Sequence, residues 1–318
     1  MIETIITVEP RGFCAGVARS VRVVEECLEL FGAPIYIKHA IVHNKTVVAD
    51  LEAKGAIIVE DIADIPEGAI AVFSAHGSPP KHFAQARDKN IKVIDATCPL
   101  VTKVHMEMIK FLQDGYRVVY IGHKGHVEGL GVVGEAKKFN IEIPILENIA
   151  DVDDIICSSD EKIAFLTQTT LSIRETDEII KALKKKCPQV IAPPANDICY
   201  ATTNRQEAVA MLAKKADIIF VVGSKTSSNS NRLVEVAKQN NCESHLIDNV
   251  SDIKSEWLQN GVNIIGLSAG ASAPEYRVQE VVDYFVSEGA KHIKLDIVKE
   301  NMQFTEPIEL VKARKEMS

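Results

Sequence analysis

Three stretches decide the fold: EPRGFCAGVARSV at 9–21, DATCPLVTKVH at 95–105 and NDICYATTNRQEAV at 196–209. In each of them a cysteine stands where a short strand gives way to a segment with helical periodicity. Short β-branched runs alternate with longer helical segments elsewhere in the chain as well, beginning with TIITV. This alternation is typical of an α/β protein, and it predicts mainly parallel sheets.

The three stretches each open a longer repeat. A second strand ends in a polar loop 29, 28 and 28 residues after the cysteines, in IVHNKTVVADL, IGHKGHVEGLGVVGEA and VVGSKTSSNSNRLVEVA. A third strand then ends in small polar residues, in AVFSAHGSPP, AFLTQTTLS and IGLSAGASAPE. Repetition at a long, constant period indicates repeated structural units.

This repeat predicts three similar α/β domains, at residues 1–97, 98–195 and 196–285. Residues 286–318 lack the repeat, and we expect them to form an irregular C-terminal tail. The residues beyond the carboxyl ends of parallel strands are the ones that meet ligands. If the domains face one another about a pseudo-threefold axis, as in a trefoil, their loops converge on one central site.

Composition limits the class of protein. A chain of 318 residues, 46% of them hydrophobic, can bury well-packed cores, so a disordered protein is excluded. The net charge of −8 opposes binding to nucleic acid and to anionic membranes. The first residues lack the basic character of a targeting signal and no apolar run is long enough to span a bilayer, so we expect a cytoplasmic protein.

The seven cysteines fall into two groups. Cys14, Cys98 and Cys199 each stand at a strand-to-helix junction, where helix amides favour a thiolate and make it a better metal ligand. A disulfide framework is not expected in a chain of this size in a reducing compartment. We interpret the remaining cysteines as ordinary buried or incidental residues: Cys27, Cys157, Cys187 and Cys242.

Three thiolates in equivalent positions predict one shared metal centre. Structural zinc normally takes four ligands in closely spaced pairs, which this sequence lacks. An iron–sulfur cluster can be held by cysteines that are far apart in the chain. We therefore expect a [4Fe–4S] cluster held by Cys14, Cys98 and Cys199, with one iron open for exchangeable ligands.

The second and third loops of the repeat are rich in hydrogen-bond donors. Such loops suit an anion with several oxygens, and histidines and hydroxyls near helix starts suit phosphate in particular. A structural histidine or a helix N-cap is the alternative for each residue alone. The loop residues are His43, Asn44, His76, Ser78, His126, Glu128, Gln168, Thr169, Thr170, Ser227, Ser228, Asn229 and Ser272.

Glu128 is the one carboxylate in these loops, and it is the candidate proton donor, since its surroundings can tune a carboxylic acid toward neutral pKa. Thr169 is the candidate to orient a substrate hydroxyl or relay the proton. The alternatives are a first-turn carboxylate and an N-cap. Two further motifs are interpreted as incidental: GLGVVG at 129–134 resembles a dinucleotide-binding loop, and His123 with His126 has the spacing of a zinc pair.

The motifs GFCAGV, IVHNK, SAHG, DATCPLV, GHKGHVEG, TQTTLS, NDICYATTNRQ, VVGSKTSSNSNRL and AGASAPE together resemble the 4-hydroxy-3-methylbut-2-enyl diphosphate reductases, over residues 1–285. The resemblance implies the trefoil of three domains around the cluster. It also implies reductive dehydroxylation of that diphosphate to isopentenyl and dimethylallyl diphosphate, the last step of the methylerythritol phosphate route to isoprenoids. Flavodoxin or ferredoxin is the implied electron donor. The implied diphosphate ligands are His43, His76, His126, Ser227, Ser228, Asn229 and Ser272, and Glu128 and Thr169 are the implied proton relay.

Two other functions stay open at this point. A cluster with an open iron also serves hydro-lyases, which remove water without net electron flow. Those enzymes bind carboxylates, and we would expect more arginines near the site than these loops offer. An iron–sulfur sensor or scaffold is the non-enzymatic alternative, and it would have no use for Glu128.

Overall fold

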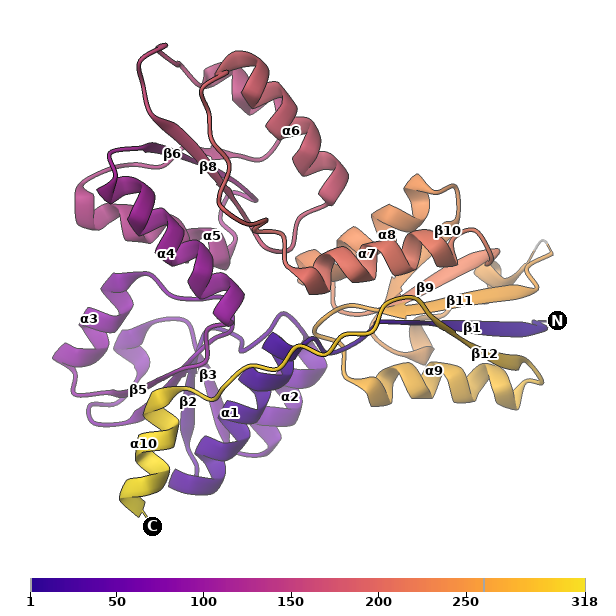
Figure 1. Cartoon of the computed structure of the whole chain (residues 1–318). Helices are drawn as coiled ribbons and strands as arrows, with labels where there is room; N and C mark the ends of the chain where they lie inside the picture. The colour runs from indigo at the N-terminus through magenta and orange to yellow at the C-terminus, as the bar shows by residue number, and fades with distance from the viewer. Residues whose placement is uncertain (1, 260, 318) are drawn as a thin grey trace. The chain divides into compact units, whose positions relative to one another are not determined.

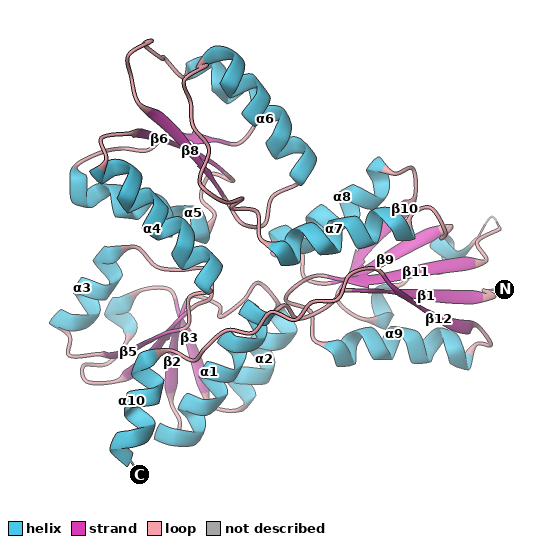
Figure 2. Cartoon of the chain, in the orientation of Figure 1, coloured by secondary structure: helices cyan, strands magenta, loops and turns pink. Residues whose placement is uncertain are grey.

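The computed structural model describes residues 2–259 and 261–317, which form two compact units. Unit 1 contains the chain up to Ala18, His43–Asp50 and Tyr200–Gln303. Unit 2 contains Arg19–Val42, Leu51–Cys199 and the chain from Phe304. Strands and helices alternate along most of the chain (Figure 1; Figure 2), so the prediction of an α/β protein is confirmed.

The sheet of unit 1 has five parallel strands in the order β10-β9-β11-β1-β12. Helix α9 lies on one side of this sheet and α7 and α8 on the other (Figure 1). The strands are β1 (Thr4–Glu9), β9 (Ile218–Val222), β10 (Glu243–Ile247), β11 (Ile264–Ala269) and β12 (Lys291–Asp296), and the helices are α7 (Tyr200–Leu212), α8 (Ser228–Gln239) and α9 (Glu275–Ser287).

Successive residues of β1 pack on opposite faces of this sheet. Ile5 belongs to the core cluster that contains Val278 of α9. Ile6 and Val8 belong to the cluster that contains Val209 of α7. Because helices cover both faces, every residue of the strand interior is buried, which explains the run IITV, in which Thr7 is the one polar residue.

Unit 2 contains two smaller parallel sheets, with the orders β3-β2-β4-β5 and β7-β6-β8. The strands of the first are β2 (Ile35–Lys38), β3 (Ala56–Val59), β4 (Ile70–Phe73) and β5 (Lys92–Asp95), and those of the second are β6 (Arg117–Ile121), β7 (Ile145–Leu146) and β8 (Ile163–Thr167). The helices of unit 2 are α3 (Pro80–Asp88), α4 (Pro99–Gln113), α5 (Val127–Gly134), α6 (Ile173–Lys186) and α10 (Ile308–Met317).

Two helices begin in unit 1 and end in unit 2: α1 (Ala15–Phe31) and α2 (Lys45–Ala53). Several connections contain short 3₁₀ turns. Asn148 and Asn249 are the N-caps of two of these turns, and each forms a reciprocal capping box. These turns are η1 (Ile62–Asp64), η2 (Glu135–Phe139), η3 (Ile149–Asp154), η4 (Val250–Asp252) and η5 (Ser255–Leu258).

The first strand departs from the domain boundaries expected from the sequence. Strand β1 was expected in a domain at 1–97, but it pairs with β11 and β12 in the sheet that contains the third repeat. A strand whose two faces are both buried belongs in the interior of a sheet, with a paired strand on each side. The repeat in the sequence does not show which sheet contains the two strands that pair with β1.

The C-terminal segment also differs from the irregular tail that we expected at 286–318. It forms the edge strand β12, whose exposed polar residues hide the strand from an apolar pattern, and the helix α10. Residues that lead into α10 are held within unit 2, where Nε of Arg19 donates to the carbonyl of Thr305 over 2.6 Å.

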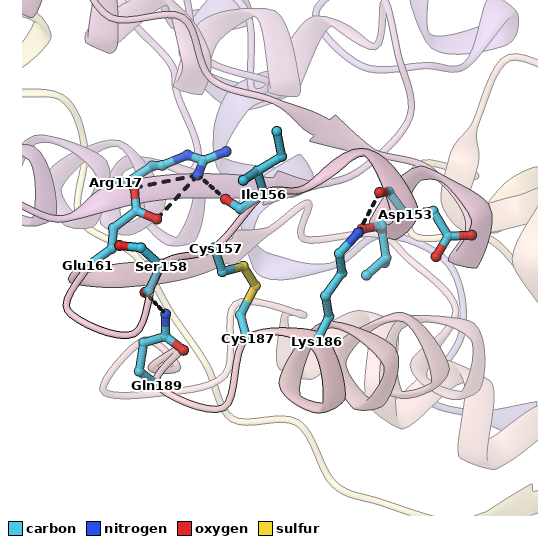
Figure 3. Close-up of a disulfide and its surroundings, with 10 residues drawn as sticks. Arg117, Asp153, Ile156, Cys157, Ser158, Glu161, Lys186, Cys187 and Gln189 are labelled. Atoms are coloured by element: carbon cyan, nitrogen blue, oxygen red, sulfur yellow. Dashed lines mark hydrogen bonds and ion pairs between the residues drawn. A yellow bond between two sulfur atoms is a disulfide. The ribbon is translucent and has the colours of Figure 1, made fainter.

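Cys157 and Cys187 form a disulfide in unit 2, with 5.8 Å between their Cα atoms (Figure 3). This is a correction, because we interpreted both as incidental residues. Lys186, beside Cys187, donates to the carbonyl groups of Val152 and Asp153. These contacts hold the end of α6 against η3, and the disulfide joins two cysteines that are 30 residues apart.

No helix among the described residues is both long enough and apolar enough to cross a membrane.

Candidate active site

The three cysteines that we expected to bind metal lie outside the disulfide and stand in equivalent local positions. Cys14 directly precedes α1, Cys98 is the N-cap of α4, and Cys199 directly precedes α7. All three are partly exposed, whereas Cys27 and Cys242 are buried free thiols. Burial raises the pKa of Cys27 to about 12, so it is a poor source of thiolate. The exposed thiols at helix starts are therefore the ones suited to metal binding.

In unit 2 the two cysteines lie against loops that contain other candidate residues. The amide of Cys98 donates to the carbonyl of Ala75 over 3.0 Å, in the loop that contains His76. The amide of Cys199 donates to the carbonyl of Thr169 over 3.1 Å. The backbone thus connects each cysteine to the loop at the end of a different strand.

Glu128 and Thr169 are in direct contact. Glu128 is 2% exposed, and its carboxyl group accepts hydrogen bonds from the Thr169 amide (2.7 Å) and the Thr169 hydroxyl (2.8 Å). Burial raises the pKa of Glu128 to about 7, against the opposite effect of the two hydrogen bonds. Thr169 therefore joins a carboxylic acid of neutral pKa to the backbone of Cys199.

His126 and His76 belong to the same part of unit 2. Nδ1 of His126 accepts from the amide of Glu128 over 3.2 Å, so the ring caps α5. Because Nδ1 is the acceptor, the proton of the neutral ring is on Nε2, which does not take part in the cap. The ring centroids of His76 and His126 lie 6.3 Å apart. Nδ1 of His76 lies 3.3 Å from the hydroxyl of Ser74, within hydrogen-bond distance. The capping role and a role at the site are thus compatible for His126.

In unit 1, Asn229 and Cys14 contact the same residue. The side-chain oxygen of Asn229 accepts from the amide of Ala271 over 2.8 Å, and the amide of Cys14 donates to the Ala271 carbonyl over 3.1 Å. The side-chain nitrogen of Asn229 is buried and has no hydrogen-bond acceptor among the described residues. A buried donor without an acceptor suggests a ligand oxygen.

The other candidates of unit 1 lie on neighbouring loops. Ser272 is buried and its hydroxyl donates to the carbonyl of His43 over 3.2 Å. Ser227 is the N-cap of α8, where its hydroxyl accepts from the amide of Ser230, and Ser228 is the first residue of that helix. Ser227 therefore has the structural role that we considered as the alternative, at a helix start that also favours anions.

The residues fit an iron–sulfur cluster by their chemistry. Both units present partly exposed thiols at helix starts. The structure brings Glu128, Thr169 and Cys199 together in unit 2, and Asn229, Ala271 and Cys14 together in unit 1. The convergence of all three sulfurs on one cluster stays a prediction.

Two positioning residues of unit 1 were not recognised in the sequence. Arg205 of α7 is 1% exposed, and its guanidinium donates to the carbonyl of Gly12 (2.9 Å) and to the carboxylate of Glu300 (3.0 Å). Gly12 lies two residues before Cys14, so this arginine supports the loop that carries the thiol. The only signal was the position of Arg205 in the NDICYATTNRQ motif.

A charged cluster in unit 2 was also not recognised in the sequence, because Lys103 and Asp197 are far apart in the chain. Nζ of Lys103 donates to Asp197 over 2.8 Å and pairs with Glu107 at 3.2 Å. Asp197 also accepts from the amide of Thr167 over 2.9 Å. The buried carboxylate of Asp197 contributes to the raised pKa of Glu128.

The two motifs interpreted as incidental have structural roles. GLGVVG at 129–134 lies within helix α5, so it is not a glycine-rich turn after a strand. Nδ1 of His123 lies 3.0 Å from the carboxylate of Glu147. The ring of His126 caps α5 instead.

The chain closely resembles known proteins. A sequence model of the LytB protein family matches residues 5–286. The chain is 48% identical over 307 residues to the 4-hydroxy-3-methylbut-2-enyl diphosphate reductase of Actinobacillus pleuropneumoniae, and the match covers 96% of this chain and 98% of that protein. It is 49% identical to the reductase of the same name from Haemophilus influenzae, with the same coverage.

Solved structures agree with these relatives. The E-1-hydroxy-2-methyl-but-2-enyl-4-diphosphate reductase from Plasmodium falciparum matches with a TM-score of 0.95 and 39% identity, over 99% of both chains. A second reductase structure, described as that of the terminal enzyme of the non-mevalonate pathway, matches with a TM-score of 0.65 and 32% identity, over 90% of this chain and all of that one. The chain therefore belongs to the LytB family, the 4-hydroxy-3-methylbut-2-enyl diphosphate reductases, which are oxidoreductases.

Proposed function

We propose that this reductase converts 4-hydroxy-3-methylbut-2-enyl diphosphate to isopentenyl diphosphate and dimethylallyl diphosphate, as the last step of the methylerythritol phosphate pathway. The reaction breaks the carbon–oxygen bond of the terminal hydroxyl, forms one carbon–hydrogen bond and releases water. It consumes two electrons and two protons. The relatives support this substrate by name, and they favour reduction over the hydro-lyase alternative.

The observation that carries the proposal is the buried acid beside a cysteine loop. Glu128, with its pKa of about 7, is held by Thr169, whose carbonyl accepts from the amide of Cys199. A carboxylic acid of that pKa is still partly protonated at neutral pH, and it can donate a proton to a departing hydroxyl. The Thr169 hydroxyl would orient the substrate oxygen toward this acid.

A [4Fe–4S] cluster held by Cys14, Cys98 and Cys199 would supply single electrons and an open iron as Lewis acid. The chain's own residues would hold the diphosphate. The side-chain nitrogen of Asn229 and the hydroxyls at the start of α8 are donors suited to its oxygens. The other proposed diphosphate ligands are His43, His76, His126 and Ser272.

Because electrons would enter singly, we infer a one-electron donor of the flavodoxin or ferredoxin kind. The test is product analysis on protein purified without oxygen, with iron and sulfide assays and electron paramagnetic resonance. We expect both C5 diphosphates only when a reductant is present. Loss of water from the substrate without a reductant would instead show a hydro-lyase, and a cluster without turnover would show a sensor.

A further inference from the structure

A cavity of about 750 Å³ lies in unit 2, beside α3 and α5. We call it the basic pocket, because four lysines line it: Lys38, Lys81, Lys137 and Lys138. Of the donor-rich loop residues named above, the described lining of this cavity includes Ser78 but none of the proposed cluster ligands, diphosphate ligands or proton-relay residues. Its volume falls within the range of small-molecule sites in proteins.

Lys38 is the most informative residue of the basic pocket. It is the last residue of β2 and only 7% exposed, yet its ammonium group has no hydrogen bond and no ion pair with any residue that the structure describes. Burial lowers its pKa, against the attraction of Glu60 and Asp61. The ammonium nitrogen itself remains accessible in the cavity wall, and an accessible cation without a counter-ion suits an anionic ligand.

The other charges leave the basic pocket positive. Glu60 lies 2.8 Å from the ring of His39, and Lys138 pairs with Glu135 at 2.7 Å. Lys81 and Lys137 have no ion pair with a described residue. This concentration of cations contrasts with the net charge of −8 of the whole chain. Several unpaired lysines around one cavity suit a phosphate or diphosphate group.

One wall of the basic pocket is apolar. Val127, Leu130 and Val133 follow one another along a single face of α5 and line the cavity together with Pro79. Leu130 is 51% exposed, so this apolar wall is open to a ligand. A ligand that covers this wall would carry a hydrocarbon part besides its charged group.

We propose that the basic pocket is a second ligand site that binds a phosphate or diphosphate ester of a short hydrocarbon chain. The lysines would bind the charged group, and the face of α5 would contact the chain. The net charge of −8 makes the rest of the surface unfavourable for an anion, whereas this cavity concentrates lysines. The pocket adjoins the proposed substrate site, since Ser74 lines it and lies 3.3 Å from His76, so the test must separate the two sites.

The test is calorimetric titration of the holoenzyme, under exclusion of oxygen, with geranyl diphosphate as the probe. We expect Lys38→Met to weaken binding about tenfold or more, as the loss of a charged hydrogen bond does. Lys110→Met is the matched control, because Lys110 is an exposed lysine of α4 that lies outside the pocket, and it should bind like the wild type. Equal affinity of Lys38→Met and the wild type would overturn the proposal.

A second pair of measurements tests the apolar wall. Leu130→Gln should weaken the binding of geranyl diphosphate but leave the weaker binding of inorganic diphosphate unchanged. If inorganic diphosphate binds the wild type as tightly as geranyl diphosphate does, the hydrocarbon part of the proposal is wrong. Thermal unfolding of Lys38→Met checks its fold, and we expect no loss because methionine keeps the buried apolar stem and the substitution breaks no hydrogen bond or ion pair between described residues.

Two outcomes separate this site from the substrate site. We expect the C5 substrate to leave the probe bound at the basic pocket, and we expect Lys38→Met to turn over substrate normally without the probe. Displacement of the probe by substrate, or a raised KM of Lys38→Met, would show that the cavity is an extension of the substrate site. The titration measures binding and not turnover. Failure of the probe to bind would therefore overturn the second site without contradicting the proposed reductase activity.

Discussion

At the residue scale, Glu128 shows how two opposing effects set one proton affinity. Burial favours the neutral acid, and the two hydrogen bonds from Thr169 favour the carboxylate. Burial has the larger effect, so the pKa rises from the ordinary value near 4.5 to about 7. Glu128 is thus a proton donor whose available fraction changes within the physiological pH range.

We expect Glu128→Gln to lower kcat/KM about 100-fold or more, because the amide cannot donate the proton. Its iron content should equal that of the wild type. In the wild type, kcat/KM should fall as the pH rises through about 7, since the protonated form of Glu128 disappears. Steady-state rates across this pH range check both statements. Unchanged reduction by Glu128→Gln would remove Glu128 from the proton relay.

Thr169→Val offers a more selective test of the same pair. It removes the hydroxyl that lies 2.8 Å from the carboxyl of Glu128 but keeps the amide hydrogen bond. The carboxylate loses one stabilising donor, so the pKa of Glu128 should rise further. The fall of activity with pH should therefore move to higher pH, which a structural defect alone would not produce.

At the element scale, a segment close to the C-terminus supports the first cysteine loop of unit 1. Arg205 of α7 connects the carbonyl of Gly12 to the carboxylate of Glu300, and all three groups belong to unit 1. Arg205 is 1% exposed, so the carboxylate of Glu300 compensates the loss of water around its positive charge. The segment after β12 thus contributes to the surroundings of Cys14.

We expect Arg205→Met to destabilise unit 1 by about 3 kcal/mol, because it leaves the Glu300 carboxylate without its charged partner and with only the hydrogen bond from Asn204. Iron content should fall as well, since the loop before Cys14 loses a hydrogen bond. Urea unfolding followed by the fluorescence of Trp257, the one tryptophan of the chain, reports on unit 1. The double variant Arg205→Met/Glu300→Gln should regain part of the stability. If it is no more stable than the single variant, the two charges are not coupled.

The disulfide acts on the elements of unit 2. Cys157 and Cys187 close a loop across 30 residues, for which chain entropy predicts about 3 to 4 kcal/mol of stabilisation. Cys157→Ser should lower the urea midpoint of unit 2 measured by circular dichroism. The transition reported by Trp257 in unit 1 is the control. Alkylation of the unfolded, unreduced protein should modify five cysteines, and modification of all seven would show that the disulfide is absent.

At the scale of the whole molecule, the proposed cluster needs one cysteine from unit 1 and two from unit 2. We expect Cys14→Ser, Cys98→Ser and Cys199→Ser each to lose most of the bound iron and all of the activity. Cys27→Ala is the control, because its buried thiol has a pKa of about 12 and should not bind iron. Iron assays on protein purified without oxygen decide this. Full iron in any one of the serine variants would remove that cysteine from the ligand set.

The sequence by itself determined the α/β class, the parallel sheets and the places of three cysteines at helix starts. These features repeat along the chain, and each depends on residues that are near one another in sequence. The position of Cys98 at a strand-to-helix junction is an example, since it was expected from the local pattern and the structure places Cys98 directly before α4.

Only the tertiary structure decided which distant segments meet. It assigned β1 to the sheet of β11 and β12, paired Cys157 with Cys187, and placed Glu300 against Arg205. It also raised the pKa of Glu128, because burial depends on everything that packs around a group. Pairing and burial are properties of the folded chain, and a local pattern of residues carries no record of them.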